Sequence, residues 1–359
     1  MRLILLLPVA SLLTFACSPP IPVDDGEGEG DGEGEGEEGE GDGAEGEGEG
    51  DVGEGEGEGD VGEGEGEGEG DVGEGEGEGE GEGEAADEAL FQRALSLYDA
   101  VPPDYAGAQQ LFDQLLAQFP DSTRADNAGY LTGRCRYETG DDAGAIVAFS
   151  AMRAAHPTSP FIDQAAYFSG RARFHLSDFV AAAADFDASL VADPAGLFAD
   201  NASFFAGRSR YEAGQLAAAR TQLQSFENTF PNSILIDNGR YYLGRAFYND
   251  GLLAESIPPF ERVALTAGSI YADNALYFTG RADYRLADYA AAIAVFEELR
   301  ASDPASQYAD NALGWQARAE FDGGDCASAR LTFDQLAADF PGSSEVARTD
   351  GYLTANGCL

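Results

Sequence analysis

Small, aromatic and polar residues recur along residues 85–359 at intervals of 37 residues, and within each interval the apolar positions follow helical spacing. The pair Gly-Arg marks the interval most clearly, at Gly133, Gly170, Gly207, Gly244 and Gly280, and Ala317-Arg318 continues it. The steps between these positions are 37, 37, 37, 36 and 37 residues. An aspartate seven residues earlier and an aromatic residue four residues later keep the same period. The pattern therefore predicts an array of repeated units.

Each unit predicts two helices. The first contains the Gly-Arg pair, as in residues 273–284, and a short turn such as residues 139–141 ends it. The second carries a small residue and an aromatic residue four places later, such as Ala145 and Phe149, and a proline such as Pro157 closes it. The glycines of the first helix let the two helices approach closely. The predicted fold class is all-α, a helical solenoid of about seven 37-residue helix pairs.

The ends and the fifth unit depart from this repeat. Residues 85–121 form a divergent first unit, and residues 343–356 predict a lone helix that caps the last unit, because a solenoid end needs cover. In the fifth unit Pro258-Pro259 falls early in the second helix. Proline inside a helix costs about 3 kcal/mol, so we expect a shortened or kinked helix there.

The repeat resembles a known family. A small residue and an aromatic residue in the first helix, glycine before the turn, alanine then phenylalanine in the second helix and a closing proline form the tetratricopeptide pattern. The linker Phe-Pro-x-Ser-x-x-Ala-Asp-Asn-Ala at residues 119–128, and its variant at residues 230–239, resembles periplasmic outer-membrane lipoproteins of the BamD and YbgF/CpoB (Tol-Pal-associated) type. The resemblance covers residues 86–359. It implies a scaffold that binds other proteins in outer-membrane assembly or in cell-division and cell-wall coordination.

The first residues predict export. Met1-Arg2 is followed by an apolar run at residues 3–15, which is a secretory signal too short to span a membrane. Residues 1–16 would be removed, and Cys17 after Ala16 resembles a bacterial lipoprotein signal, which implies a lipid anchor on Cys17. Ser18 favours the outer membrane, facing the periplasm or the cell surface. The alternative is ordinary cleavage after Ala16, which leaves a soluble exported protein.

The distribution of acidic residues along the sequence distinguishes a linker from the folded part. Thirty of the 66 acidic residues lie between Asp24 and Glu84, mostly alternating with glycine and without one basic residue. Residues 17–84 therefore predict the anchor cysteine and a disordered tether that spans about 45 Å or more. The net charge of -46 and the absence of lysine argue against nucleic acid as a partner, because phosphate binding needs basic patches.

The cysteines and histidines predict structure rather than catalysis. Cys326 opens the last second helix and Cys358 follows the terminal helix, so both fall at the same end of the stack and a disulfide is expected. Cys135 stands where other units carry alanine, which predicts a small core residue. His156 and His175 have no metal-ligand partner at useful spacing. No catalytic motif is present, and we predict no enzyme activity, metal or cofactor.

The family resemblance places the candidate binding residues. In tetratricopeptide proteins the concave groove is lined by the second, fifth, ninth and twelfth places of the first helix, and at about 100° per residue these places share one stripe. Here the stripe comprises Asn127, Tyr130, Arg134, Tyr137, Gln164, Tyr167, Arg171, Phe174, Asn201, Phe204, Arg208, Tyr211, Asn238, Tyr241, Arg245, Tyr248, Asn274, Tyr277, Arg281, Tyr284, Asn311, Arg318 and Phe321. Amide, aromatic and arginine side chains suit an extended peptide.

Two alternatives stay open for this stripe. The aspartate before each amide would pair with the arginine of a neighbouring unit in a structural ladder, and aromatic residues at helical spacing often pack inside the fold. The predicted partner is a protein or extended peptide. The alternative ligand is a glycan, either peptidoglycan or another polysaccharide, stacked on the rings.

Overall fold

The computed structural model describes the backbone of residues 81–358 and the side chains from residue 86. The chain divides into Met1–Gly77 and Glu78–Leu359, and the description below concerns the second part. The predicted signal sequence, the anchor cysteine Cys17 and most of the predicted tether lie outside the described residues. Residues 81–84, expected in the tether, begin the first helix, where acidic residues favour the positive end of the helix dipole.

The described residues form helices throughout and contain no strand. The helices are α1 (Gly81–Tyr98), α2 (Tyr105–Gln118), α3 (Ala125–Glu138), α4 (Asp142–Ala155), α5 (Ile162–His175), α6 (Phe179–Ala192), α7 (Ala199–Glu212), α8 (Leu216–Thr229), α9 (Ile236–Asn249), α10 (Leu253–Ala264), α11 (Ala272–Arg285), α12 (Tyr289–Ser302), α13 (Ala309–Asp322), α14 (Cys326–Asp339) and α15 (Ser344–Ala355). Among these residues, no helix is both long and apolar enough to cross a membrane.

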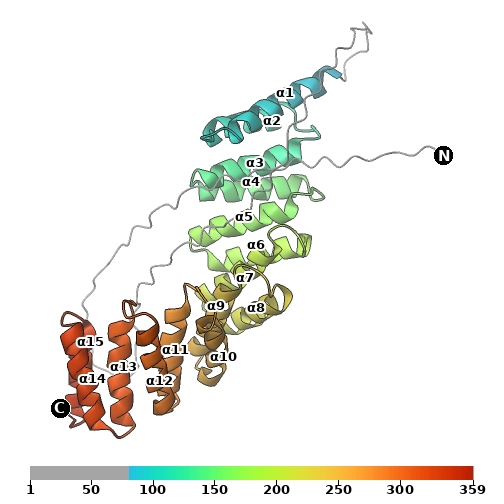
Figure 1. Ribbon diagram of the computed structural model, residues 1–359. Helices are drawn as coiled ribbons and strands as arrows, with labels where there is room; N and C mark the ends of the chain where they lie inside the picture. The colour runs from blue at the N-terminus through green and yellow to red at the C-terminus, as the bar shows by residue number, and fades with distance from the viewer. Residues whose placement is uncertain (1–80, 359) are drawn as a thin grey trace, which may run out of the picture. The chain divides into compact units, whose positions relative to one another are not determined.

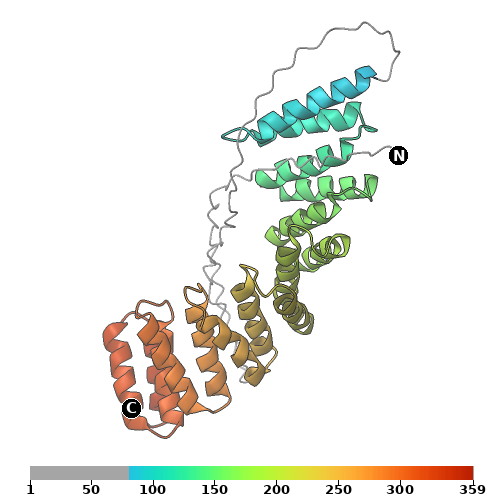
Figure 2. The same cartoon turned by 45° about the vertical axis from the view of Figure 1, so that its right-hand side comes forward.

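Consecutive helices pair into units one to seven, from α1–α2 to α13–α14, and each pair lies against the next in a row (Figure 1). A second view shows the same order of side-by-side pairs (Figure 2). Helix α15 packs on α13 and α14 as the terminal cap. The all-α solenoid predicted from the period is therefore confirmed.

Glycine sets the distance between the helices of a unit. A Cβ atom added to Gly133 would lie 2.4 Å from the ring of Phe149, and one added to Gly280 would lie 2.6 Å from the ring of Phe296. No side chain fits at either position, so the rings of the second helix rest directly on the backbone of the first. Phe149 and Phe296 have no exposed surface.

The fifth unit differs as its prolines predict. Its second helix α10 has 12 residues, whereas the second helices of the other units have 14. Pro258 and Pro259 both lie inside it. The helix continues past both prolines and ends at Ala264.

The last unit carries the disulfide. Cys326 at the start of α14 is joined to Cys358 after α15, across a sequence separation of 32 residues. Ala329, Leu353 and Cys358 form a small buried cluster beside the bond. Cys135 is a free cysteine without exposed surface. The terminal helix is thus fixed both by apolar packing and by a covalent bond.

Candidate functional site

The fifth place of the stripe lies in the core. Tyr130, Tyr167, Phe204, Tyr241 and Tyr277 are each at most 2% exposed. Four of these rings stack on an aromatic residue in the linker to the next unit. The stacked pairs are Tyr130–Phe161, Tyr167–Phe198, Tyr241–Tyr271 and Tyr277–Tyr308, with ring centres 4.5 to 5.3 Å apart. Linker rings cover four of these five side chains, and Phe204 packs against Phe205, Phe226 and Tyr242, so the five rings favour the alternative of packing inside the fold.

The arginines at the ninth place form a continuous column with aromatic rings. Each guanidinium lies over the ring that follows it by 34 residues, or by 33 residues across the short fifth unit, so the ring belongs to the next unit. The distances from guanidinium carbon to ring centre are 3.8 Å for Arg134 and Phe168, 4.5 Å for Arg171 and Phe205, 4.9 Å for Arg208 and Tyr242, 4.2 Å for Arg245 and Phe278, 5.0 Å for Arg281 and Trp315, and 5.9 Å for Arg318 and Tyr352. The column therefore joins each unit to its successor.

The same arginines also bond within their own helix. Arg134 donates to the Tyr130 hydroxyl at 3.1 Å and to Glu138 at 2.7 Å, and Arg245 donates to the Tyr241 hydroxyl at 2.7 Å. Burial raises the pKa of Tyr130, so its phenol stays neutral and accepts this bond. Stacking uses the flat face of a guanidinium and hydrogen bonds use its edge, so one arginine serves both contacts.

Three of the aspartates before the amides accept hydrogen bonds from serine hydroxyl groups. Asp126 accepts a hydrogen bond from Ser159 at 2.7 Å, Asp200 from Ser233 at 2.7 Å and Asp310 from Ser343 at 2.6 Å. Each serine lies in the linker that leads to the next unit. These contacts form a ladder of aspartate and hydroxyl that runs parallel to the column of arginine and aromatic ring.

The second and twelfth places have intermediate exposure. Asn127, Gln164, Asn201, Asn274 and Asn311 are half-buried, whereas Asn238 is 8% exposed. Asn274 donates to the Tyr308 hydroxyl of the next linker at 2.7 Å. At the twelfth place Tyr137, Phe174, Tyr211, Tyr284 and Phe321 are half-buried, and Tyr248 is 2% exposed. These aromatic residues face the neighbouring unit more than they face solvent.

A thirteenth place, which the sequence prediction missed, completes the surface. It holds Glu138, His175, Glu212, Asn249, Arg285 and Asp322, all half-buried or exposed. Its members contact the stripe: Asn249 donates to the Tyr211 hydroxyl at 2.9 Å, and Tyr284 donates to Asp322 at 2.6 Å. The i,i+4 relation to the arginine was the available signal, since such residues are neighbours on a helix.

Helical geometry explains which places are accessible. At about 100° per residue the second, ninth and thirteenth places fall within an arc of about 40°, and the fifth and twelfth places lie on the side of that arc that faces the next unit. We call the second, ninth and thirteenth places the outer line. The residues of the outer line are half-buried or exposed in six consecutive units, except Arg134 and Asn238, which are 4% and 8% exposed.

This arrangement defines a class of protein, the helical repeat proteins. In this chain the first helices of units two to seven carry the polar outer line, and stacked aromatic rings lie beneath it. Comparison with protein families matches the tetratricopeptide repeat at residues 104–160, 204–272 and 277–344, which is more than half of the 359 residues. The chain belongs to the tetratricopeptide repeat family. Its fold is typical of non-catalytic scaffolds that bind other proteins. A search of curated proteins finds no match.

One solved structure supports the same fold, and two others match with TM-scores below 0.5 and carry no argument. The C-terminal part of a tetratricopeptide repeat-containing protein from Cytophaga hutchinsonii is 16% identical with a TM-score of 0.53, and the match covers 74% of this chain and 98% of that one. A tetratricopeptide repeat protein from Parabacteroides merdae is 12% identical with a TM-score of 0.46, over 74% and 97% of the two chains. Pseudomonas aeruginosa pilF is 16% identical with a TM-score of 0.45, over 64% and 98%. At these identities the likeness concerns the fold alone.

Proposed function

We propose that this protein is a cell-envelope lipoprotein, anchored through Cys17, that binds a protein partner or an extended peptide along the outer line. The partner's process would be outer-membrane assembly or cell-division and cell-wall coordination, as in the lipoproteins of the BamD and YbgF/CpoB type that the linker resembles. The anchor rests on the signal pattern of residues 1–17, and the long acidic segment would carry the solenoid away from the membrane.

One observation carries the binding part of the proposal: the outer line repeats in six consecutive units, but only its thirteenth place changes from unit to unit. The second place holds an amide and the ninth an arginine throughout, while the thirteenth place holds glutamate, histidine, glutamate, asparagine, arginine and aspartate in turn. Amides bond an extended backbone without regard to its side chains. A varied thirteenth place supplies the differences that select one partner sequence over another.

Crosslinking from the outer line in living cells tests this proposal. A photo-reactive residue in place of Gln164 or Asn249 leaves the buried rings in place, because Gln164 is half-buried and Asn249 is exposed. Tyr248 is unsuitable, since a change at a side chain that is 2% exposed disturbs packing. The matched control is Val147, which is 66% exposed on the second helix α4.

A discrete protein adduct from Gln164 and Asn249, absent from Val147, is the expected result, and mass spectrometry identifies the partner. Equal adducts from all three positions, or none from either line position, contradict binding at the outer line. Retention of the purified protein on protein-free cell wall, lost on changing the outer line, favours the glycan alternative. For the anchor, Cys17→Ser should release the protein from the membrane fraction, and unchanged membrane association contradicts the lipid anchor.

A further inference from the structure

The contacts between consecutive units share one position on the side opposite the outer line. We call the contact of a second helix with the first helix of the next unit a joint, and number the joints from one, between α2 and α3, to six, between α12 and α13. The shared position comprises two residues. One follows the fully buried ring or leucine of the second helix, as Asp113 follows Phe112, and the other is the eleventh place of the next first helix, such as Arg136. At about 100° per residue, the eleventh place lies about 160–180° around its helix from the outer line, so this is a separate surface.

In the first and third joints this position is an ion pair. Arg136 pairs with Asp113 at 3.8 Å, and Arg210 pairs with Asp187 at 2.5 Å. The second and fourth joints have no carboxylate at the position and hold Ser150 with Arg173, and Gln224 with Phe247. In the first and third joints, the carboxylate therefore faces a guanidinium group of the next unit.

The sixth joint holds two carboxylates, Glu297 and Glu320, and bonds both to one amide. Gln316 donates to Glu320 at 2.9 Å and to Glu297 at 3.5 Å. Arg300 donates to the oxygen of the same amide at 2.6 Å, which fixes the orientation of its NH₂ group. In the first, third and sixth joints the chain itself thus places N–H groups beside the carboxylates of this position.

The fifth joint holds two carboxylates, Glu261 of α10 and Asp283 of α11, without such a donor. Neither carboxylate has a hydrogen bond or an ion pair to another residue in the described part of the chain. Asp283 is only 8% exposed, although its carboxylate oxygens still reach solvent. Thr279 stands in the place of the bridging amide and donates instead to the carbonyl of Ala275 at 2.8 Å. Burial raises the pKa of Asp283, and the nearby charges of Asp288 and Glu261 raise it further, so the charged groups around this carboxyl are acidic.

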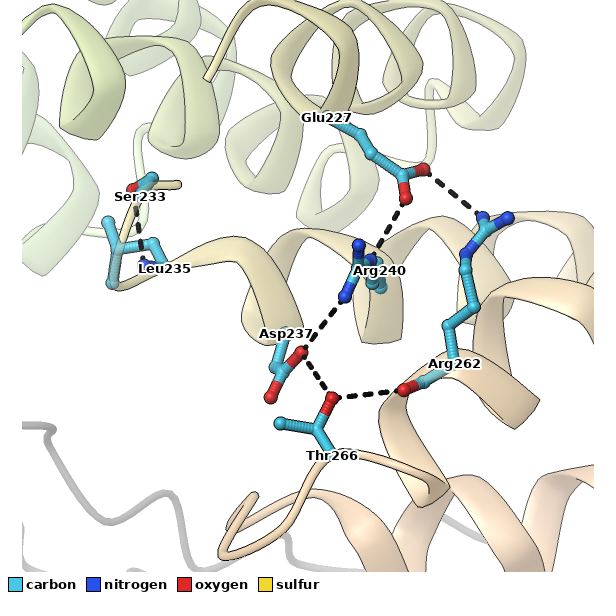
Figure 3. A network of polar contacts seen from close by, with 7 residues as sticks. All are labelled: Glu227, Ser233, Leu235, Asp237, Arg240, Arg262 and Thr266. Atoms are coloured by element: carbon cyan, nitrogen blue, oxygen red, sulfur yellow. Dashed lines mark hydrogen bonds and ion pairs between the residues drawn. The ribbon is translucent and has the colours of Figure 1, made fainter. Parts of the chain in front are cut away.

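The arginines next to the two carboxylates in the sequence are engaged elsewhere. Arg262, which follows the first carboxylate, donates to Glu227 at 3.1 Å (Figure 3). Glu227 also accepts from Arg240 at 2.9 Å, so this glutamate lies between two arginines. Arg285, two residues after the second carboxylate, lies with its guanidinium carbon 5.1 Å from the centre of the Tyr248 ring. Neither neighbouring arginine therefore neutralises the pair in the fifth joint.

We propose that the fifth joint binds a positively charged side chain, arginine or lysine, of a partner protein. Its N–H groups would bond Glu261 and Asp283 together, as the chain's own donors do at this position in other joints. A long side chain suits the site, because Asp283 is mostly buried while Glu261 and Asp288 are exposed beside it. This site is independent of the outer line and does not require the function proposed for it.

Two observations favour a side chain over a metal ion. Among the described residues, no group of three or more histidine, cysteine, aspartate or glutamate side chains is arranged to hold a metal. The groups that occupy the same position in other joints are the guanidinium groups of Arg136 and Arg210 and the amide of Gln316. All three are planar nitrogen groups on side chains, and the proposed ligand has the same kind of donor.

The test uses the full chain with three defined probes, the peptides acetyl-Gly-Arg-Gly-amide, acetyl-Gly-Lys-Gly-amide and the neutral acetyl-Gly-Gln-Gly-amide. Binding is followed at pH 7 by NMR of the Asp283 carboxyl carbon, which reports this site and not the acidic chain as a whole. We expect both basic peptides to shift this signal and the neutral peptide to leave it unchanged. The basic peptides should also lower the pKa of Asp283 from about 6, because they bind its ionised form.

Glu261→Gln should weaken the binding of both basic peptides about fivefold or more, since it removes one of the two charged acceptors. Asp283→Asn, followed at the Glu261 carboxyl carbon, should weaken it to a similar extent. The matched control is Asp334→Asn, because Asp334 is an exposed carboxylate at the same place of the last second helix, α14. It should leave the affinity within about twofold of the unchanged protein. Circular dichroism checks the fold of each variant.

Three outcomes would overturn the proposal. The first is an Asp283 signal that neither basic peptide shifts, and the second is an equal shift with the neutral peptide. The third is an equal loss of affinity in Asp334→Asn and Glu261→Gln, since binding would then follow the overall negative charge. A shift with calcium chloride but with neither basic peptide would assign the site to a metal ion instead.

Discussion

Units two to four and units five to seven share one interior and differ on the side opposite the outer line. Both halves stack an arginine over the ring of the next unit, at 4.5 Å for Arg171 and at 5.0 Å for Arg281. At the eleventh place of the first helix, however, the first half holds Arg136, Arg173 and Arg210, each paired with an aspartate, and the second half holds Phe247, Asp283 and Glu320. The repeated contacts hold the units together, and the altered place puts a buried carboxyl group in unit six.

Substitutions of buried rings should cause the largest loss of stability, and the loss should be similar in units two to four and in units five to seven. Phe186→Ala in unit three and Phe296→Ala in unit six each remove a ring without exposed surface. Each should lower the free energy of unfolding by about 3–5 kcal/mol, measured by chemical denaturation. Hydrogen exchange then locates the loss, because units of a solenoid can open separately. A loss below about 1 kcal/mol in one half alone would contradict a shared interior.

Removal of the disulfide should lower the stability only of the C-terminal end of the solenoid. Changing both Cys326 and Cys358 to serine should cost about 3 kcal/mol in the stability of α14 and α15, since the bond closes a loop across 32 residues. Hydrogen exchange in units two to four should not change. The control is Cys135→Ala, which matches the alanine of other units. Faster exchange throughout the chain would show that the cap stabilises every unit.

The arginine column should contribute equally to the stability of both halves. This contribution should depend on the planar guanidinium group. Arg171→Lys and Arg281→Lys should each cost about 1–2 kcal/mol, because lysine keeps the charge and loses the stacked fork. The control Arg330→Lys changes an exposed arginine and should cost less than about 0.5 kcal/mol. Thermal unfolding measures all three. If lysine is tolerated at both column positions, charge alone would explain the column.

The smallest effect is a pH dependence confined to the second half. Burial, with Asp288 and Glu261 nearby, raises the pKa of Asp283 to about 6. The unfolded pKa is about 3.9, so the folded chain holds this proton more tightly, and its stabilising effect is lost as the pH rises through about 6. From pH 7 to pH 5 this group should add about 1 kcal/mol of stability.

Asp283→Asn should remove that increment and should be the more stable form at pH 7. Denaturation at both pH values measures the free energy of unfolding of the variant and of the unchanged protein. The difference between the two proteins removes the contribution of other carboxylates, because these titrate in both. The control Asp334→Asn removes an exposed carboxylate and should leave the increment unchanged. An increment that persists in Asp283→Asn would assign the pH dependence to another group.

The periodic parts of the fold were predictable because they are encoded locally. Helix positions follow from the 37-residue period, and the cap follows from the apolar end of a stack. The candidate site was predictable only in part. The burial of Tyr130 could not be predicted from its own unit, because the linker ring of Phe161 that covers it belongs to a different unit.

The sequence by itself determined that the chain is a helical repeat and how many units it has, since helical period and proline position act within a few residues. Only the tertiary structure decided that three of the aspartates bond to linker serines and that the arginines lie on the rings of the next unit. Each of these depends on the stagger between neighbouring units, which brings together residues about 20 to 40 positions apart and is set by the packing of whole helices.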